Sequence, residues 1–244
     1  LSWGAPPGLF FQGLEKYSIC FSNGWENRYK RPVNVSLQER VDAVMQRMAQ
    51  ACARCGRDPS SVQLIAVSKT YGAEMIRDAV DCGLTVFGES KVQEAKAKIP
   101  LCPSMLTWHM IGHLQRNKVG LAVELFDRIH SVDSLRLLET VDRASSEVGK
   151  TMPVLLEVNV SGEASKFGLA PEDVPAVLTA ATRLNHLNVV GLMTMPPVTD
   201  DAEKARAHFR KLRELRDRWR AESGFALEEL SMGMSHDFEV AIEE

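Results

Sequence analysis

Lys69 is the residue of this sequence that packing explains least well, because it follows the apolar run 64–67. Side chains alternate between the two faces of a β-strand, so Lys69 would share a face with Ile65 and Val67 and approach the interior. A desolvated lysine amine favours its neutral form, which is the nucleophile that forms a Schiff base with an aldehyde. Alternatively, Lys69 lies just past the strand and extends its amine into water.

Residues 231–235, with the sequence Ser-Met-Gly-Met-Ser, have the composition of an anion-binding loop. Gly233 would let the backbone approach a ligand closely, while Ser231 and Ser235 offer hydroxyls. A helix that begins near His236 would add backbone amides, and together these groups could hold a phosphate. An ordinary turn has the same composition, so the motif alone leaves both interpretations open.

Two other motifs have the spacing of metal ligands but lack supporting features. Cys52 and Cys55 form a C-x-x-C motif without a second pair, and Cys52 continues the apolar stripe of a helix. His109 and His113 are four residues apart, but Gly112 interrupts the segment between them. A structural role is therefore favoured over a metal site for both motifs.

Short β-rich runs alternate with helical stretches from Ser36 onward. The first helix is predicted to begin at a capping box, Ser36 with Glu39, and to end at Gly56. Strands are predicted to start near Val62, Leu84, Leu106, Arg128, Val154, Val189 and Glu229. This alternation predicts an α/β fold of parallel strands with right-handed crossovers, either an open doubly wound sheet or a closed (β/α)8 barrel.

The fifth predicted strand favours the barrel. Its alternate residues in 154–160 are all apolar, whereas Leu155, Glu157 and Asn159 lie on the other face. The apolar face can pack on helices while the more polar face lines a lumen near its open end. We therefore predict a TIM-type (β/α)8 barrel, whose chemistry would lie at the carboxyl ends of its strands.

Barrel geometry relates the two chemical motifs to each other. Lys69 would end the first strand and residues 231–235 the seventh, and those strands lie near each other on a closed barrel. An aldehyde that carries a phosphate would suit both ends of such a site. Pyridoxal 5'-phosphate (PLP) is the obvious candidate, and no G-x-G-x-x-G motif or P-loop supports a nucleotide instead.

Composition excludes several classes of protein. The chain has 244 residues and a formal net charge of -3, so no positive field would gather nucleic acid or an anionic membrane surface. No apolar segment is long enough to span a bilayer and no signal peptide is evident, which predicts a cytoplasmic protein. Five scattered cysteines do not predict a disulfide framework.

Residues 1–33 differ from the rest of the chain, because they contain seven aromatic residues and show no clear period. We expect them to be an extension outside the fold. One barrel domain is predicted from residue 34 to residue 244.

From about Ser36 to Glu244 the sequence resembles the single-domain PLP homeostasis proteins, which are related in fold to the barrel domain of bacterial alanine racemase. The resemblance rests on ordered motifs at residues 66–69, 87–90, 92–94, 108–118, 130–134, 158–163, 166–168, 191–196 and 230–235. It implies a protein of intracellular PLP homeostasis with no established catalytic substrate. PLP-dependent apoenzymes are its implied partners, with a monomer or weak dimer as its expected state.

The resemblance also implies specific contacts to the cofactor. Lys69 would carry PLP as a Schiff base, and Ser231, Gly233 and Ser235 would bind the phosphate. Further contacts are implied for Ser90, Asn159, Met195 and Met234.

The sequence departs from the family pattern in two places. Ser90 stands where the family commonly has Asn, which shortens a polar contact near the cofactor ring. The sequence also stops at Glu244, before the family's last strand, which usually supplies an Arg and half of the phosphate contacts. A barrel without that strand would have open edges, so we expect weakened PLP affinity and a tendency to aggregate.

Two other functions remain open from the sequence. A PLP-dependent amino-acid racemase would use the same lysine, which could move one proton even without a second acid/base residue. A Schiff-base aldolase-type barrel would bind a sugar phosphate without PLP, although aldolase lysines usually lie on later strands.

Overall fold

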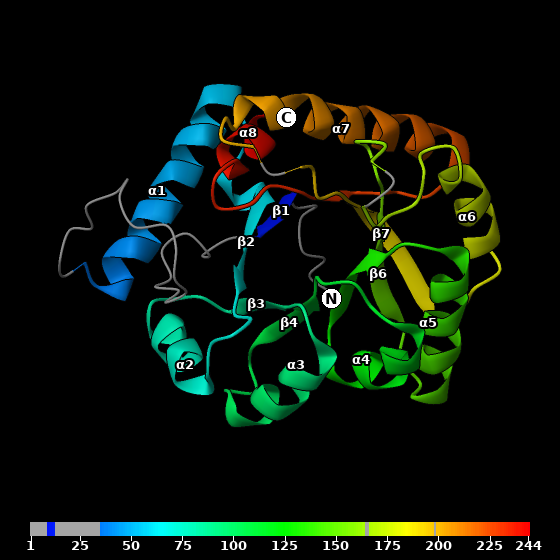
Figure 1. Cartoon of the computed structure of the whole chain (residues 1–244), viewed down its shortest axis with the longest axis horizontal. Helices are drawn as coiled ribbons and strands as arrows, with labels where there is room; N and C mark the ends of the chain where they lie inside the picture. Colours follow the sequence, from blue (N-terminus) through cyan, green and yellow to red (C-terminus); the bar gives the residue numbers. More distant parts are fainter. Residues whose placement is uncertain (1–8, 13–34, 164–165, 198) are drawn as a thin grey trace, which may run out of the picture.

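The computed structural model describes residues 9–12, 35–163, 166–197 and 199–244, and for residues 9–12 only the backbone is described. Within these residues, eight parallel strands form a closed barrel in chain order (Figure 1). The strands are β1 (Leu9–Gln12), β2 (Val62–Val67), β3 (Val86–Glu89), β4 (Thr107–Met110), β5 (Arg128–Val132), β6 (Met152–Glu157), β7 (Leu187–Met193) and β8 (Glu229–Ser231). The seven strands predicted from the sequence are all present, and the predicted barrel class is confirmed.

The structure differs from the expectation for residues 1–33 at β1. The backbone of Leu9–Gln12 pairs with β2 from Val62 to Ile65, and with β8 at Leu230 and Ser231. This segment occupies the gap that the sequence prediction assigned to a missing last strand. The physical reason is that the facing edges of β2 and β8 offer unpaired N–H and C=O groups, which an extended apolar segment can satisfy. Residues 1–8 and 13–34 lie outside the described residues.

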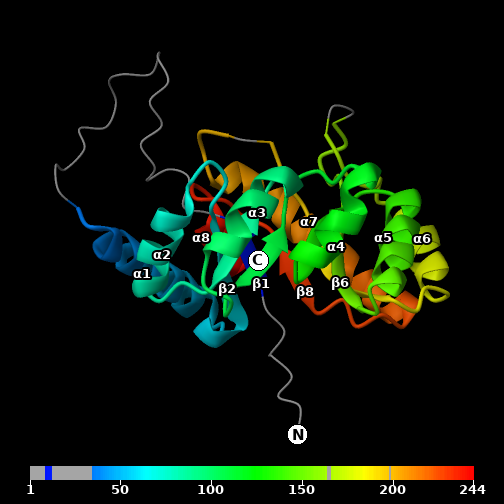
Figure 2. The ribbon, with the colours of Figure 1, turned by 90° about the horizontal axis from the view of Figure 1, so that it is seen from below.

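Helices surround the strands as an outer ring (Figures 1 and 2). They are α1 (Leu37–Cys55), α2 (Ala73–Asp81), α3 (Val92–Lys98), α4 (Val119–Leu125), α5 (Leu135–Glu147), α6 (Val174–Ala181), α7 (Glu203–Ser223) and α8 (Phe238–Glu243), with short 3-10 turns η2 (Pro59–Ser61), η3 (Ile99–Leu101) and η4 (Arg116–Lys118). The ends predicted for α1 are confirmed by the reciprocal capping box of Ser36 and Glu39 and by Gly56, whose φ is 68°. No helix in the described part of the chain has the length and apolarity needed to cross a membrane.

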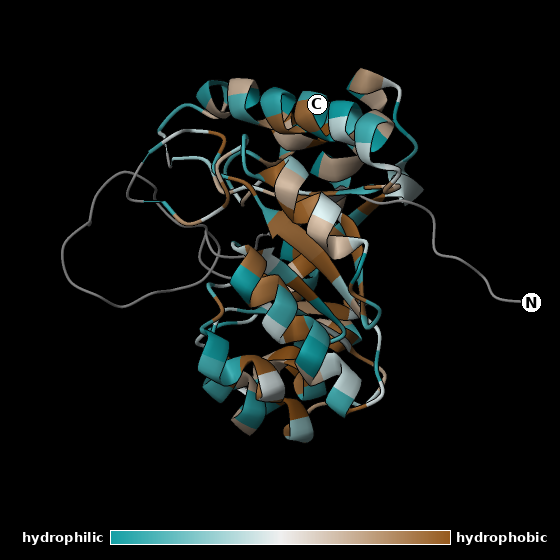
Figure 3. Cartoon of the chain, turned by 90° about the vertical axis from the view of Figure 1, so that its right-hand side faces the viewer, coloured by the Kyte–Doolittle hydropathy of each residue, from teal (hydrophilic) through white to brown (hydrophobic). Residues whose placement is uncertain are grey.

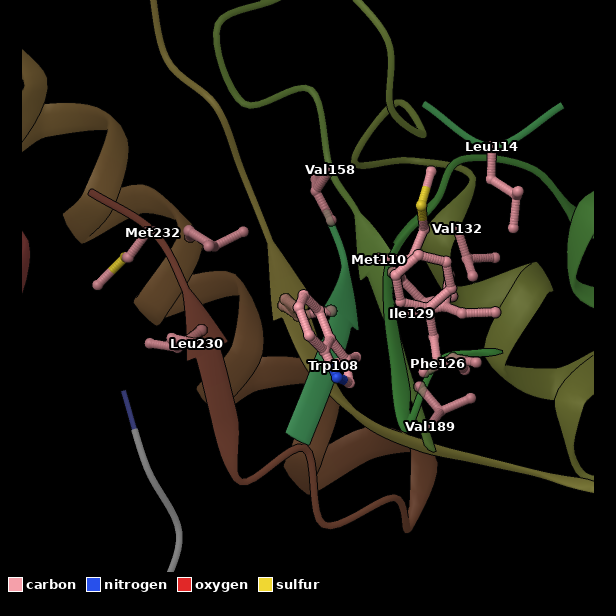
Figure 4. Packing of buried hydrophobic residues seen from close by; sticks show 14 of the residues in the cluster. Trp108, Met110, Leu114, Phe126, Ile129, Val132, Val158, Val189, Leu230 and Met232 are labelled. Atoms are coloured by element: carbon pink, nitrogen blue, oxygen red, sulfur yellow. The ribbon is translucent and has the colours of Figure 1, made fainter. Parts of the chain in front are cut away.

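The main hydrophobic core lies between the strands and the helices. Val154, Leu156, Val158 and Val160 all belong to it, which confirms the predicted outer face of the fifth predicted strand, β6. Figure 4 shows Trp108 of β4 and Ile129 of β5 among the packed side chains. The strands are mainly apolar, whereas the helices expose polar residues on their outer side (Figure 3).

A second, smaller apolar cluster lies apart from the main core. Ile65 and Val86 form this cluster. A methyl group added at Gly88 would lie 2.9 Å from Ile65 Cγ2 and 3.0 Å from Ile111 Cδ1, so a larger side chain at this position would crowd these two residues.

Candidate functional site

Lys69 lies two residues beyond the end of β2, at the carboxyl end of the barrel, and its side chain is half-buried. Ile65 and Val67, on the same face of the chain, are buried. Each of the two interpretations of the sequence is met in part. Lys69 lies past the end of the strand, but its side chain is not fully exposed to water. The side chain of Lys69 is therefore partly shielded from water at the carboxyl end of the barrel.

The residue before Lys69 is fixed by a buried ion pair. Lys98 Nζ donates to the backbone carbonyl of Ser68 over 2.8 Å and to Glu89 Oε1 over 2.7 Å. Ser68 Oγ donates to the same Glu89 oxygen over 2.6 Å. Burial raises the pKa of Glu89, while the hydrogen bonds from Lys98 and Ser68 lower it. The carboxylate and the ammonium thus clamp both the side chain and the carbonyl of Ser68.

The residue after Lys69 is also held. The backbone N–H of Thr70 donates to Glu94 Oε1 over 2.5 Å, and Lys98 Nζ reaches the same oxygen over 2.9 Å. Thr70 has a φ of 69°, a left-handed conformation that a β-branched residue rarely adopts. The network of Glu89, Glu94 and Lys98 therefore fixes a strained turn that carries Lys69. Sequence analysis assigned no role to these three residues.

Ser90 follows β3 directly and is half-buried at the same end of the barrel. A methyl group added at Gly112 would lie 2.7 Å from Ser90 Cα, so only glycine allows this close approach of the two backbones. Ser131 Oγ donates to the carbonyl of Gly112 over 2.6 Å and so helps to hold the backbone of Gly112 in place. Gly112 therefore sets the position of Ser90, rather than merely interrupting a histidine pair.

The loop 231–235 follows β8 and contains two different serine environments. Ser231 is buried, and its Oγ lies 2.8 Å from His130 Nδ1. Ser235 Oγ is also buried but has no hydrogen-bond partner among the described residues. Gly233 has a φ of 89°, which explains why a glycine stands there.

The helix expected after this loop differs from the prediction. α8 begins at Phe238 instead of near His236 and has six residues. The backbone N–H groups of Asp237 and Phe238 both donate to the carbonyl of Met234, over 3.1 Å and 2.9 Å. The N–H of Met234 donates to Asp237 Oδ1 over 2.5 Å. These three amides are therefore engaged within the loop.

Asn159 and Met195 follow β6 and β7. The amide of Asn159 donates to the carbonyl of Glu163 over 2.8 Å and accepts from Ser161 Oγ and the N–H of Gly162, both over 3.0 Å. Its side chain thus shapes its own loop. Met195 is 41% exposed. Figure 2 shows the described parts of the loops after β6 and β7 projecting from one side of the ring.

A carboxyl group that sequence analysis did not single out lies at the end of β6. Glu157 is 7% exposed, and burial together with the nearby charge of Asp133 raises its pKa to about 7. Asp133 Oδ2 lies 3.1 Å from His113 Nδ1, and the His113 ring stacks on Phe167 at 4.0 Å between centroids. The period of two in β6 predicts the inward direction of Glu157, but the charge of Asp133 comes from the loop after β5.

Two buried histidines lie beneath the loop 231–235. His130 Nε2 is 3.0 Å from His109 Nδ1, while its other nitrogen meets Ser231. Desolvation and the charge of Arg128 lower the pKa of His109 to about 3, and desolvation places the pKa of His130 well below 6.5. Both rings are therefore neutral at physiological pH. Arg128, also on β5, pairs with Glu229.

The described residues contain no group of three or more His, Cys, Asp and Glu side chains that could hold a metal ion. Cys55 Sγ instead donates to the carbonyl of Cys52 over 3.4 Å, which is a contact of a helix end.

Comparison with known proteins identifies the family. The model of the alanine racemase N-terminal domain matches residues 40–243. The pyridoxal phosphate homeostasis protein of Aquifex aeolicus is 44% identical over 207 residues, which are 84% of this chain and 91% of that protein. The protein of the same name from Pseudomonas aeruginosa is 41% identical over 210 residues, 86% of this chain and 90% of that protein.

Solved structures agree with the sequence comparison. PipY of Synechococcus elongatus, solved without PLP, has a TM-score of 0.74 and 39% identity, covering 82% of this chain and 93% of that one. The same protein solved with PLP bound has a TM-score of 0.71. The alanine racemase of Clostridium difficile, at 10% identity and a TM-score of 0.60, shares the fold alone. The chain therefore belongs to the alanine racemase N-terminal domain family, and over most of its length it is similar to proteins named for pyridoxal phosphate homeostasis.

Proposed function

We propose that this protein binds PLP as a Schiff base on Lys69 and serves in the homeostasis of intracellular PLP. One observation carries the proposal. Lys69 and the loop 231–235 follow β2 and β8, two strands that β1 alone separates, and in a parallel barrel both ends lie on the same side. The relatives named for PLP homeostasis, and the PipY structure with PLP bound, support the same ligand.

The residues of the loop fit a phosphate. A buried hydroxyl without a partner costs about 1–3 kcal/mol, so Ser235 Oγ is a group that an anion would satisfy. The left-handed backbone at Gly233 is a conformation that glycine adopts without strain, which allows the loop to turn at this point. Ser231 would add a second hydroxyl, whereas Met234 would contribute through its side chain, because its N–H is engaged by Asp237.

The covalent step needs only Lys69 and the aldehyde. Nucleophilic attack by Lys69 Nζ forms a C=N bond and releases one water, and hydrolysis reverses the step. When bound, PLP would supply an aldehyde in covalent but exchangeable form. Ser90, Asn159 and Met195, each at the end of a neighbouring strand, are proposed to border the cofactor.

The proposed role is that of a carrier rather than a catalyst. The proposed partners are PLP-dependent apoenzymes in the cytoplasm, and the proposed state is a monomer or weak dimer. Racemases of similar fold share less than a fifth of their sequence with this chain, so they lend no support for an activity here. Slow racemisation that Lys69→Ala abolishes would argue for the enzymatic alternative.

The test is reduction of the protein with borohydride after incubation with PLP, followed by mass mapping. We expect a visible absorbance band before reduction and a pyridoxyl adduct on Lys69 after it. Lys69→Arg keeps the charge but should abolish both signals. Lys91→Arg, a change of the same kind at an exposed residue before α3, should abolish neither. An adduct on another lysine, or no adduct, would overturn the proposal.

A further inference from the structure

The hydroxyl of Ser231 contacts His130, which in turn contacts His109, and both histidines are buried. The contact with His130 restricts the hydrogen bonds that the Ser231 hydroxyl can make to a ligand. A serine hydroxyl has one proton to donate and two lone pairs that accept. The 2.8 Å contact with His130 Nδ1 uses either the proton or a lone pair. A phosphate accepts hydrogen bonds, so Ser231 can bind it well only if the hydroxyl proton points away from His130.

Proton counting limits the hydrogen-bonded chain of His109, His130 and Ser231 to two possible directions. His109 and His130 are 2% and 0% exposed, and as neutral rings each carries a single proton. The contacts of His130 with Ser231 and with His109 Nδ1 then allow two arrangements only. In the inward arrangement Ser231 donates to His130, and His130 donates to His109. In the outward arrangement His109 Nδ1–H donates to His130 Nε2, and His130 Nδ1–H donates to Ser231 Oγ.

We infer that His109 and His130 are positioning residues for the phosphate of PLP: the outward chain donates to Ser231 Oγ and thereby turns the Ser231 hydroxyl proton toward the anion. The inference rests on the proposed function, because it needs a phosphate at the loop 231–235. The burial of both rings and the nearby guanidinium of Arg128 keep the pair neutral, so it orients the hydroxyl without adding a charge of its own.

The first experiment compares two ligands that differ only in the phosphate, PLP and pyridoxal, by equilibrium binding. Loss of a hydrogen bond to a charged group is expected to weaken PLP binding of Ser231→Ala by roughly ten- to hundredfold. Pyridoxal binding should not change. Ser145→Ala is the matched control, since Ser145 is buried on α5 and its hydroxyl has no partner among the described residues.

The same comparison is then made at His130. His130→Leu removes the donor and should weaken PLP but not pyridoxal, by roughly three- to tenfold, as expected for a neutral hydrogen bond. His130→Asn can place an amide N–H where Nδ1–H was, and should restore most of the PLP affinity. In the Ser231→Ala background, His130→Leu should have no further phosphate-specific effect.

The second experiment determines directly which ring nitrogens of His130 and His109 carry protons, and it needs no variant. In protein with 15N-labelled histidine and bound PLP, we expect His130 to be protonated at Nδ1 and unprotonated at Nε2. His109 should be protonated at Nδ1. If His130→Leu does not fold, this measurement and His130→Asn decide the question.

The outcomes separate the inference from the proposed function. Protonation of His130 at Nε2 in the PLP complex, or an equal effect of His130→Leu on PLP and pyridoxal, would overturn the inference while Lys69 still carried the adduct. An unchanged PLP affinity in Ser231→Ala would overturn it too, by removing Ser231 from the phosphate site. Failure of the adduct on Lys69 would instead overturn the proposed function.

Discussion

At the scale of single residues, the candidate site combines one lysine amine with polar groups that differ sharply in their surroundings. Lys69 is half-buried, the Ser235 hydroxyl has no partner within the described part of the chain, and Glu157 is a buried carboxyl at the end of β6. Glu157 lies at the end of the barrel where the ligand is proposed to bind. Its protonation state therefore affects both stability and the charge of the site.

Glu157 should make the protein less stable as the pH rises. Its pKa is about 7 in the folded protein against an ordinary value of 4.5, so between these pH values the folded state binds more protons than the unfolded state. The penalty is absent below pH 4.5 and complete above pH 7, where it amounts to about 3 kcal/mol.

Urea unfolding of Glu157→Gln from pH 4.5 to pH 8 checks this expectation. The variant should gain stability over the wild type as the pH rises, by roughly 2–3 kcal/mol at pH 8. Glu163→Gln, an exposed residue of the following loop, should follow the wild type at every pH. A constant difference between Glu157→Gln and the wild type would show that the carboxyl does not titrate in this window.

At the scale of elements, the turn after β2 depends on α3 and β3. Lys98 of α3 and Glu89 of β3 hold Ser68, and Glu94 holds Thr70, so two neighbouring elements fix the residue between them. The buried pair is costly to form but more costly to break, because either partner alone leaves an uncompensated charge.

Lys98→Met should therefore destabilise the protein by about 3–5 kcal/mol, since Glu89 then remains buried and unpaired. The double variant Lys98→Met with Glu89→Gln should recover part of this loss. Both variants should slow formation of the borohydride-trapped adduct on Lys69, because Lys98 no longer holds the carbonyl of Ser68 in the turn before Lys69. Chemical unfolding and the trapping rate measure the two effects, and an unchanged trapping rate in folded Lys98→Met would exclude a positioning role.

At the scale of the whole molecule, β1 joins β8 to β2 and closes the barrel. Closure satisfies the backbone of two strands that carry the candidate site, and without it both would be edges. A segment distant in sequence thus completes the scaffold that positions Lys69 and Ser231.

Phe10→Pro tests this closure. Proline removes a backbone N–H and fits poorly within a central strand, so we expect a loss of about 3 kcal/mol and a lower midpoint of thermal unfolding. Phe10→Ala keeps the N–H, and the difference between the two variants reports the backbone contribution. Equal midpoints for the two variants would mean that pairing of β1 contributes nothing to stability.

The sequence by itself determined seven of the eight strands, the barrel class and the positions of Lys69 and the loop 231–235 at strand ends, because hydrophobic periods, caps and turn residues are local signals. It also determined the outer face of β6. Only the tertiary structure decided which residues meet across strands: His130 with Ser231, Lys98 with Ser68, and β1 with β8. Such contacts join residues far apart in the chain, and no local period encodes the partner of a buried polar group.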